Sequence, residues 1–123
     1  MSFNKAKIAT EIITIPRKCH IRDNSIFDLL KETKYFELHN EASVHDIRKA
    51  LACDPVCVQE WMQYIDDQRC SSSWYFGLND ENLYEVGFYD SNADPARSNQ
   101  VVYDNAMDAC AAFIKHQIES IRA

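Results

Sequence analysis

The hydrophobic pattern of this 123-residue chain changes its period close to residue 71. Before that point apolar residues recur at the three- and four-residue spacing of helices, and from Trp74 to Phe88 they alternate with period two. Helices grouped together and strands grouped together favour an antiparallel sheet covered by helices. We therefore expect a single α+β domain over residues 1–123, with an antiparallel three- to four-stranded sheet packed on one face by about four helices.

The N-terminal segment contains one predicted strand and one predicted helix. Thr10–Ile15 is rich in β-branched residues and is followed by Pro16, a pattern typical of a short strand. Ser25 precedes apolar residues at helical spacing from Ile26 to Thr33. Serine is a favoured N-cap, so we expect a helix to begin directly after it.

Two further helices are predicted in the middle of the chain. Ser43 and Asp46 form an S-x-x-D capping pattern ahead of a helix that extends through Leu51. Asp54 followed by Pro55 is a helix-start pattern, because proline lacks the amide hydrogen that would be left unbonded there. Helical spacing then predicts a helix from Pro55 to about Gln68, with these residues on one face: Val58, Trp61, Met62 and Ile65.

A β-hairpin follows, with residues 79–82 as its polar turn. Period two predicts one common face for these six residues: Trp74, Phe76, Leu78, Tyr84, Val86 and Phe88. Gln100–Tyr103 predicts a third strand, and Asp104 or Asn105 is expected to cap a C-terminal helix.

The chain has only two glycines, Gly77 and Gly87. Phosphate-binding loops of nucleotide and dinucleotide enzymes need several glycines at fixed spacing. The sequence therefore excludes those classes of enzyme, and we predict no cofactor.

Five cysteines occur at irregular spacing: Cys19, Cys53, Cys57, Cys70 and Cys110. An odd, irregular set argues against a disulfide framework, and it lacks the two matched pairs of a structural zinc site. We predict no metal site and expect most of these thiols to be reduced core residues. Because the N-terminal segment has no apolar run longer than Ile12–Ile13, we also expect a cytosolic protein without a membrane segment.

Catalytic and nucleic-acid-binding patterns are absent as well. The four histidines fall in three different predicted segments with no motif around any of them: His20, His39, His45 and His116. No pair of carboxylates has a recognisable acid–base context. The two helices around Asp54 have helix-turn-helix spacing, but the second contains Glu60, Asp66 and Asp67 and no lysine or arginine. Contact with phosphates needs cations, so we expect no nucleic-acid binding and no enzyme activity.

Charge is distributed unevenly along the chain. Residues 1–49 hold nine lysines and arginines against seven acids, a balance of +2, whereas residues 50–123 hold four against twelve, a balance of −8. Residues 66–108 alone carry nine acids against Arg69 and Arg97, a balance of −7. One interpretation is a solvated acidic surface that maintains solubility. The other is a binding face for a basic partner.

Tyrosines in the same stretch favour the second interpretation. If period two turns Trp74 and Phe76 toward the helices, Tyr75, Glu85 and Tyr89 face outward. Tyrosines supply contact area in interfaces and carboxylates steer the encounter, although outward tyrosines also form packing pairs within a sheet. We predict a partner-binding face of nine residues: Asp66, Asp67, Tyr75, Asp80, Glu81, Glu85, Tyr89, Asp90 and Asp94.

Three segments carry a family resemblance: D-Q-R-C-S-S-S-W-Y-F, Y-E-V-G-F-Y and V-Y-D-N-A-M-D-A-C-A-A-F-I-K. Over roughly Ala50 to Ile121, the chain resembles small bacterial immunity proteins of contact-dependent growth inhibition and related polymorphic toxin systems. The resemblance implies a cytosolic inhibitor without activity of its own, which binds one cognate toxin C-terminal domain, often a nuclease with a basic cleft. No binding residue is carried over from the family by motif.

The resulting hypothesis is an immunity protein that neutralises a basic nuclease toxin domain through its acidic, tyrosine-bearing face. Two alternatives remain open at this point. One is a small adaptor or regulatory domain that binds a protein other than a toxin. The other is a small enzyme whose site is assembled only by the fold.

Overall fold

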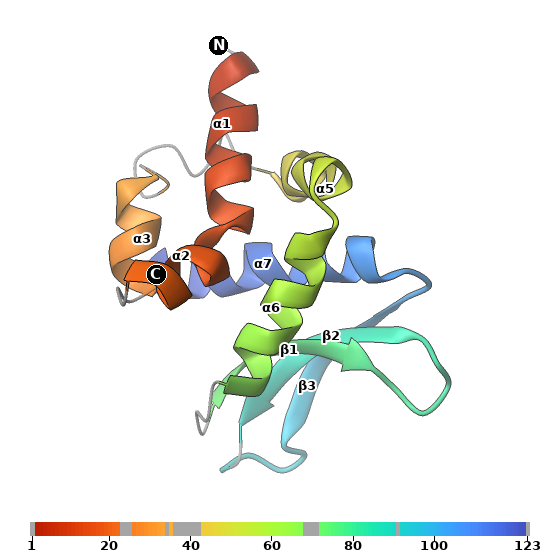
Figure 1. Cartoon of the computed structure of the whole chain (residues 1–123). Helices are drawn as coiled ribbons and strands as arrows, with labels where there is room; N and C mark the ends of the chain where they lie inside the picture. Colours follow the sequence, from red (N-terminus) through yellow and green to blue (C-terminus); the bar gives the residue numbers. More distant parts are fainter. Residues whose placement is uncertain are drawn as a thin grey trace.

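The computed structural model describes residues 2–22, 26–33, 35, 43–67, 72–90 and 92–122, with side chains at 7–18, 28–33, 35, 43–64, 74–90 and 92–121. Figure 1 shows the helices gathered on one side of a sheet, with α7 passing between the N-terminal helices and the strands. The elements are, in chain order, α1 (Ser2–Ile13), α2 (Ile15–Arg22), α3 (Ile26–Glu32), α5 (Val44–Cys53), α6 (Val56–Asp67), β1 (Ser72–Leu78), β2 (Tyr84–Asp90), β3 (Arg97–Tyr103) and α7 (Ala106–Arg122).

The sheet is antiparallel, in the order β1-β2-β3. The predicted hairpin is confirmed, because Phe76 pairs with Val86 and the turn over residues 79–82 connects the two strands. The predicted third strand is also confirmed but begins earlier, at Arg97. A bulge near Gly87 shifts the pairing of β2 with β3, and Asn99 on β3 has a positive φ of 54°.

One face of the sheet packs on helices. Phe76 and Val86 are 5% and 2% exposed and lie in the same core as the buried residues of α7. The ring of Phe113 on α7 contacts both Phe76, at a centroid distance of 5.2 Å, and Trp61 on α6, at 5.9 Å. The predicted α+β class, an antiparallel sheet with helices packed against it, is confirmed.

The middle helices begin where the capping patterns predict. The hydroxyl of Ser43 accepts the amide hydrogen of Asp46, and the Asp46 carboxylate accepts that of Ser43, which completes a capping box on α5. Helix α6 covers 56–67, within one residue of the predicted 55–68. Helix α3 begins at Ile26 as expected, while its predicted N-cap Ser25 lies outside the described residues.

The predicted strand at Thr10–Ile15 is wrong. Residues 2–13 form helix α1, Thr14 is a turn, and α2 begins at Ile15. The reason is burial: Ile8, Ala9, Ile12 and Ile13 are all buried, and their i, i+1, i+4, i+5 spacing is that of one helix face. Packing of that face against the core outweighs the modest strand preference of β-branched residues. The sheet therefore has three strands among the described residues.

The C-terminal helix α7 starts as predicted. The side-chain oxygen of Asn105 accepts the amide hydrogen of Asp108 at 2.8 Å, so Asn105 is the N-cap. Its side-chain amide also donates to the Asp108 carboxylate, which holds the pKa of Asp108 below its usual range, and the Arg48 guanidinium adds to this effect. The buried residues of α7 run from Ala109 to Ile114 and include Ile118.

Helix α6 is attached to α1 by a buried hydrogen bond. The indole nitrogen of Trp61 donates to the carbonyl oxygen of Ile13 at 3.0 Å, at the C-terminal end of α1 where carbonyl groups lack helical partners. The Thr14 hydroxyl donates to the carbonyls of Thr10 and Glu11 at the same helix end. These bonds provide donors for carbonyl oxygens at the end of α1, where the chain turns into α2.

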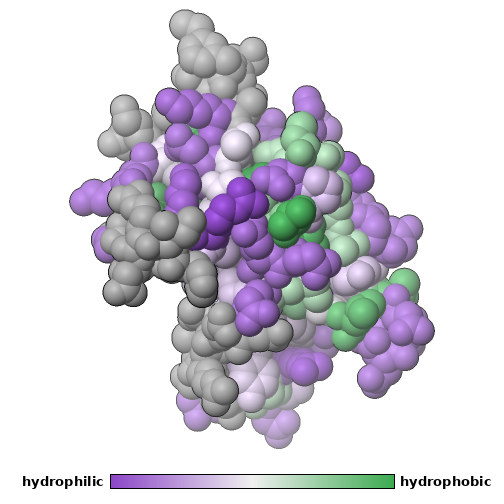
Figure 2. Space-filling model, in the orientation of Figure 1, coloured by the Kyte–Doolittle hydropathy of each residue, from purple (hydrophilic) through white to green (hydrophobic). Residues whose placement is uncertain are grey.

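The surface seen in Figure 2 has hydrophobic residues in small groups among hydrophilic ones. No helix of the described residues is both long and apolar enough to cross a membrane. Of the cysteines described, Cys57 and Cys110 are buried, as expected for core thiols, and Cys53 is exposed.

Candidate functional site

The face of the sheet opposite Phe76 and Val86 carries the outward residues predicted from the alternation. We call it the open face and define it by its residues on the three strands: Tyr75, Gly77, Glu85, Gly87, Tyr89, Arg97, Gln100 and Val102. Tyr75 and Glu85 are half-buried, and Tyr89 is 36% exposed. The hairpin register sets Tyr75 opposite Gly87 and Glu85 opposite Gly77.

The structure brings Tyr75 and Glu85 into direct contact. The Tyr75 hydroxyl donates to Oε2 of Glu85 at 2.6 Å, and Nε2 of Gln100 donates to the same oxygen at 3.2 Å. Tyr75 therefore forms a cross-strand pair, the alternative role that outward tyrosines have in sheets. Its aromatic ring nevertheless remains part of the open face.

These contacts fix the protonation states of both groups. Burial, reinforced by the bond to the Glu85 carboxylate, raises the pKa of Tyr75 to about 12. The hydrogen bonds from Tyr75 and then Gln100 lower the pKa of Glu85 below its usual range. At neutral pH the open face thus holds a phenol that is protonated and a carboxylate that is ionised.

Sequence reasoning missed two residues of this site, Arg97 and Gln100. The Arg97 guanidinium carbon lies 5.3 Å from the centroid of the Tyr75 ring, in cation–π geometry. Arg97 also adds a positive charge close to Glu85, so the centre of the open face is less acidic than the segment balance of −7 suggested. Placing β3 against β2 in the correct register would have revealed both residues, but the bulge at Gly87 hides that register in the sequence.

The two glycines of the chain both lie on the open face, but their surroundings differ. A Cβ atom at Gly87 would be 2.7 Å from the Tyr75 hydroxyl, so the tyrosine can cross the strand only because residue 87 has no side chain. A Cβ atom at Gly77 would meet nothing within 4 Å. The sheet surface at Gly77 is therefore open, directly across from Glu85.

Asp80 and Glu81 lie on the β1–β2 turn, at the Glu85 end of the hairpin. Both are exposed, and the turn is held by the Asn79 side chain, which accepts the amide hydrogens of Glu81 and Leu83. Leu78 beside them is 59% exposed. The sequence has no lysine, arginine or histidine from residue 70 to residue 96, so no basic residue of the hairpin neutralises these carboxylates.

The remaining predicted site residues lie at the other end of the strands. Asp90 ends β2 and bonds the amide of Asn92, and Asp94 is exposed on the β2–β3 connection. Asp66 and Asp67 end α6, and their side chains are outside the described ones. A seven-residue strand is about 20 Å long. The predicted residues on the strands and their connections are therefore divided between the two ends of the hairpin, with Tyr75 between them, whereas Asp66 and Asp67 belong to α6.

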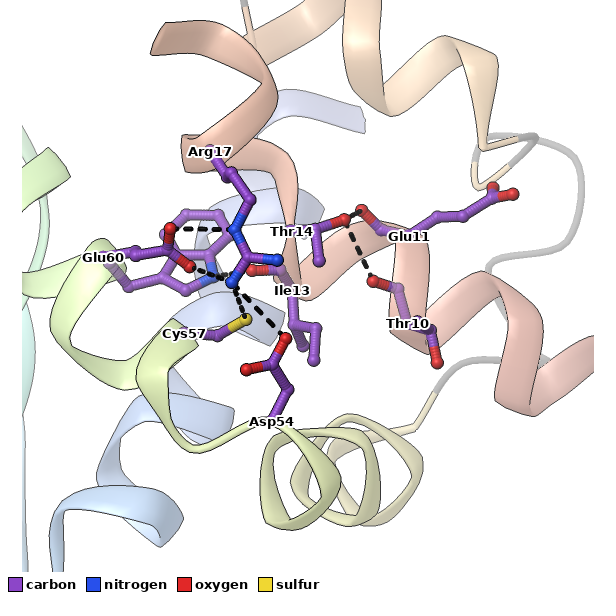
Figure 3. A network of polar contacts seen from close by, with 9 residues as sticks. Thr10, Glu11, Ile13, Thr14, Arg17, Asp54, Cys57 and Glu60 are labelled. Atoms are coloured by element: carbon purple, nitrogen blue, oxygen red, sulfur yellow. Dashed lines mark hydrogen bonds and ion pairs between the residues drawn. The ribbon is translucent and has the colours of Figure 1, made fainter. Parts of the chain in front are cut away.

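A second polar cluster lies between α2 and α6 (Figure 3). The Arg17 guanidinium binds the Glu60 carboxylate through two hydrogen bonds of 2.8 and 2.9 Å and lies 3.4 Å from the Asp54 carboxylate. The hydrogen bond and charge of Glu60 raise the pKa of Arg17. We interpret this cluster as structural, because it joins α2 to the start of α6 and both carboxylates share the Arg17 guanidinium.

The buried thiols do not have the properties of nucleophiles. Burial, reinforced by the nearby Asp54 carboxylate, raises the pKa of Cys57 to about 12, and burial also raises that of Cys110. Reactive cysteines need the opposite shift. Among the residues whose placement is described, no group of three or more histidine, cysteine, aspartate or glutamate side chains could hold a metal ion.

Comparisons with known proteins give no relative for this chain: no protein-family model, no curated protein and no solved structure matches it.

Proposed function

We propose that this chain is a cytosolic immunity protein that binds and neutralises a cognate toxin domain with a basic, nucleic-acid-processing cleft. The segments from Asp67 to Lys115 that resemble such inhibitors motivate the proposal. The observation that carries it is the charge at the turn end of the hairpin. Asp80 and Glu81 are exposed there, and the ionised Glu85 lies next to them on β2.

Charge complementarity is the physical basis for this choice of partner. A nuclease cleft is positive because it must attract a phosphate backbone. Exposed carboxylates without neighbouring cations imitate the negative charge of the phosphate backbone and speed association with the cleft. This effect weakens as salt screens the charges. Tyr75 and Tyr89 then provide aromatic contact area of the kind that interfaces favour.

The test is to express the C-terminal domain encoded by the gene immediately upstream, with and without this chain. We expect growth arrest by the toxin domain, rescue by co-expression, and a complex whose association rate falls as salt increases. Rescue without any salt dependence of the association rate would contradict the electrostatic part of the proposal. Failure of co-expression to restore growth would contradict the function itself.

Matched charge reversals locate the binding surface. Glu81→Lys changes the net charge at the hairpin turn, and Glu11→Lys makes the same change on α1, where Figure 3 shows the side chain turned away from the Arg17 cluster. We expect the first variant to slow association several-fold and the second to have little effect. Equal effects of both variants would indicate a response to overall charge alone.

A further inference from the structure

Gly77 has no explanation within the fold. Glycine in a strand weakens the strand, and it often marks a place where a ligand or another chain approaches the backbone closely. Gly87 is accounted for by Tyr75, which occupies the space a side chain would need. At Gly77 the backbone has no positive φ, and a Cβ atom would touch nothing within 4 Å. The fold would therefore accept a side chain at this position.

The group beside this open position is the Glu85 carboxylate. Glu85 is the cross-strand partner of Gly77, and the two residues are on the same face of the sheet. Both hydrogen bonds that Glu85 accepts from described residues end on Oε2, from Tyr75 and Gln100. Its Oε1 accepts none from that part of the chain. The carboxylate is thus held in place by one oxygen, and the other is available to a donor from outside.

We propose that the open position above Gly77 receives an arginine side chain of a basic protein partner, whose guanidinium pairs with Oε1 of Glu85. The inference rests on the proposed function and names the contact through which the toxin domain is recognised. A guanidinium is planar, weakly hydrated and rich in donors, so it can lie flat on the glycine backbone while it donates to the carboxylate. Tyr75 and Gln100 hold the acceptor in advance, which reduces the ordering that binding requires.

Other occupants fit the position less well. A phosphate or an acidic peptide would meet the negative charge of Glu85, with Asp80 and Glu81 on the adjoining turn. An apolar side chain would shield Oε1 of the ionised Glu85 from water without offering it a donor, which is unfavourable. A lysine ammonium could reach the same oxygen, but it is a strongly hydrated point charge and gains less from a flat surface.

A short peptide tests the contact without the toxin. The probe is an acetylated, amidated tetra-arginine peptide, titrated at low salt while backbone amide shifts are followed by NMR. We expect the largest shifts at Gly77 and Glu85. Affinity should fall about tenfold in Glu85→Gln, because a charge-assisted pair is lost, and similarly in Gly77→Val, because the position is filled. The control Ala93→Val places the same valine side chain on the exposed β2–β3 connection and should bind like the parent chain.

Two outcomes would overturn the proposal. Shifts spread over all acidic residues and unaltered in Gly77→Val would show that the peptide follows overall charge. Equal binding of a tetra-lysine peptide would remove the preference for a guanidinium. Because a Cβ atom at residue 77 meets no neighbour, Gly77→Val is expected to fold. A thermal unfolding curve of this variant, measured before the titration, checks that it does.

The co-expression experiment separates this inference from the proposed function. Rescue from the toxin domain that persists with unchanged affinity in Gly77→Val would leave the function in place and overturn the arginine contact. Peptide binding at Gly77 without any rescue would support the contact and overturn the function. Loss of both rescue and peptide binding in Gly77→Val supports the two together.

Discussion

At Gly87 the absence of a side chain is a packing requirement. Tyr75 crosses the strand above this residue, and its hydroxyl reaches Glu85 at 2.6 Å. The ring also carries the Arg97 guanidinium on its face. One tyrosine therefore connects all three strands on the open face, through Gly87 and Glu85 on β2 and through Arg97 on β3.

Gly87→Ala is expected to destabilise the protein by about 1–3 kcal/mol, because its Cβ would lie 2.7 Å from the Tyr75 hydroxyl. Gly77→Ala, the matched control, should leave stability unchanged or raise it by up to about 1 kcal/mol. Urea denaturation of both variants measures the difference. In the double variant Gly87→Ala/Tyr75→Phe the loss should be smaller than the sum of the single losses, because the two residues are in contact. Equal stabilities of the two alanine variants would contradict this account.

The ionisation of Tyr75 makes stability depend on pH in the alkaline range. An unfolded tyrosine loses its proton near pH 10, whereas folded Tyr75 keeps it until its pKa of about 12. Between these values the folded state binds more protons, so this contribution to stability is complete below pH 10 and is lost as pH rises toward 12. The absorbance of tyrosinate should show a late-titrating tyrosine that is missing in Tyr75→Phe. Titration of that residue near pH 10 would contradict the prediction.

At the scale of elements, Trp61 on α6 connects α1 with α7. Its indole bonds the end of α1, and its ring contacts Tyr64 on α6 and Phe113 on α7. Phe113 in turn contacts Phe76 on β1. Aromatic contacts therefore run from α6 through α7 to the buried face of the sheet, and the hydrogen bond of Trp61 adds α1 to this set.

Trp61→Phe is expected to lower stability by about 2–4 kcal/mol, because it leaves the Ile13 carbonyl without its donor and creates a cavity. Trp74→Phe is the control at the sheet, where the tryptophan is half-buried and stacks on His116 at 4.0 Å. That change should cost about 1 kcal/mol. The free energies of unfolding from denaturant titration compare them, and equal losses would show that the bond to Ile13 contributes little.

Most elements could be predicted because their signals are local. The capping box at Ser43, the start of α6 near Pro55 and the hairpin register each depend on residues a few positions apart. Most of Thr10–Ile15 is helical although its composition is β-branched, because the helical spacing of Ile8, Ile12 and Ile13 buries one face of α1. That helix is stabilised by burial against distant elements, which composition does not report.

The candidate site was predictable only in part. Alternation sufficed to place Tyr75 and Glu85 on the same outward face. Their hydrogen bond, the partnership with Gln100 and the stacking of Arg97 depend on where β3 lies against β2, and a bulge sets that register. A charge balance counted along the sequence also does not show that Asp80 and Asp94 lie at opposite ends of the strands.

At the scale of the whole molecule, the described residues form a helical layer on one face of the sheet, which leaves the other face and the outer edge of β3 uncovered (Figure 1). Val101 and Val102 on that edge strand are about half exposed. No described strand pairs with the outer edge of β3, so part of its backbone amides have no partner in the sheet.

Amide hydrogen exchange should reflect this arrangement. Amides of the central strand β2 are expected to exchange slowest within the sheet, and alternate amides of β3 should exchange close to the unprotected rate. NMR-detected exchange at neutral pH measures both sets. Protection of every β3 amide would contradict an uncovered edge and would show that a second strand pairs with it.

The contrast between the two glycines also affects how such a protein can change over generations. A substitution at Gly87 alters the packing that Tyr75 needs, so its main effect is on the stability of the fold. At Gly77 new side chains meet open space, so variants differ in what they exclude or admit rather than in whether they fold. Under the proposed function, a library of all residues at position 77, selected against a panel of basic toxin domains, should therefore yield altered partner preferences with nearly constant melting temperatures.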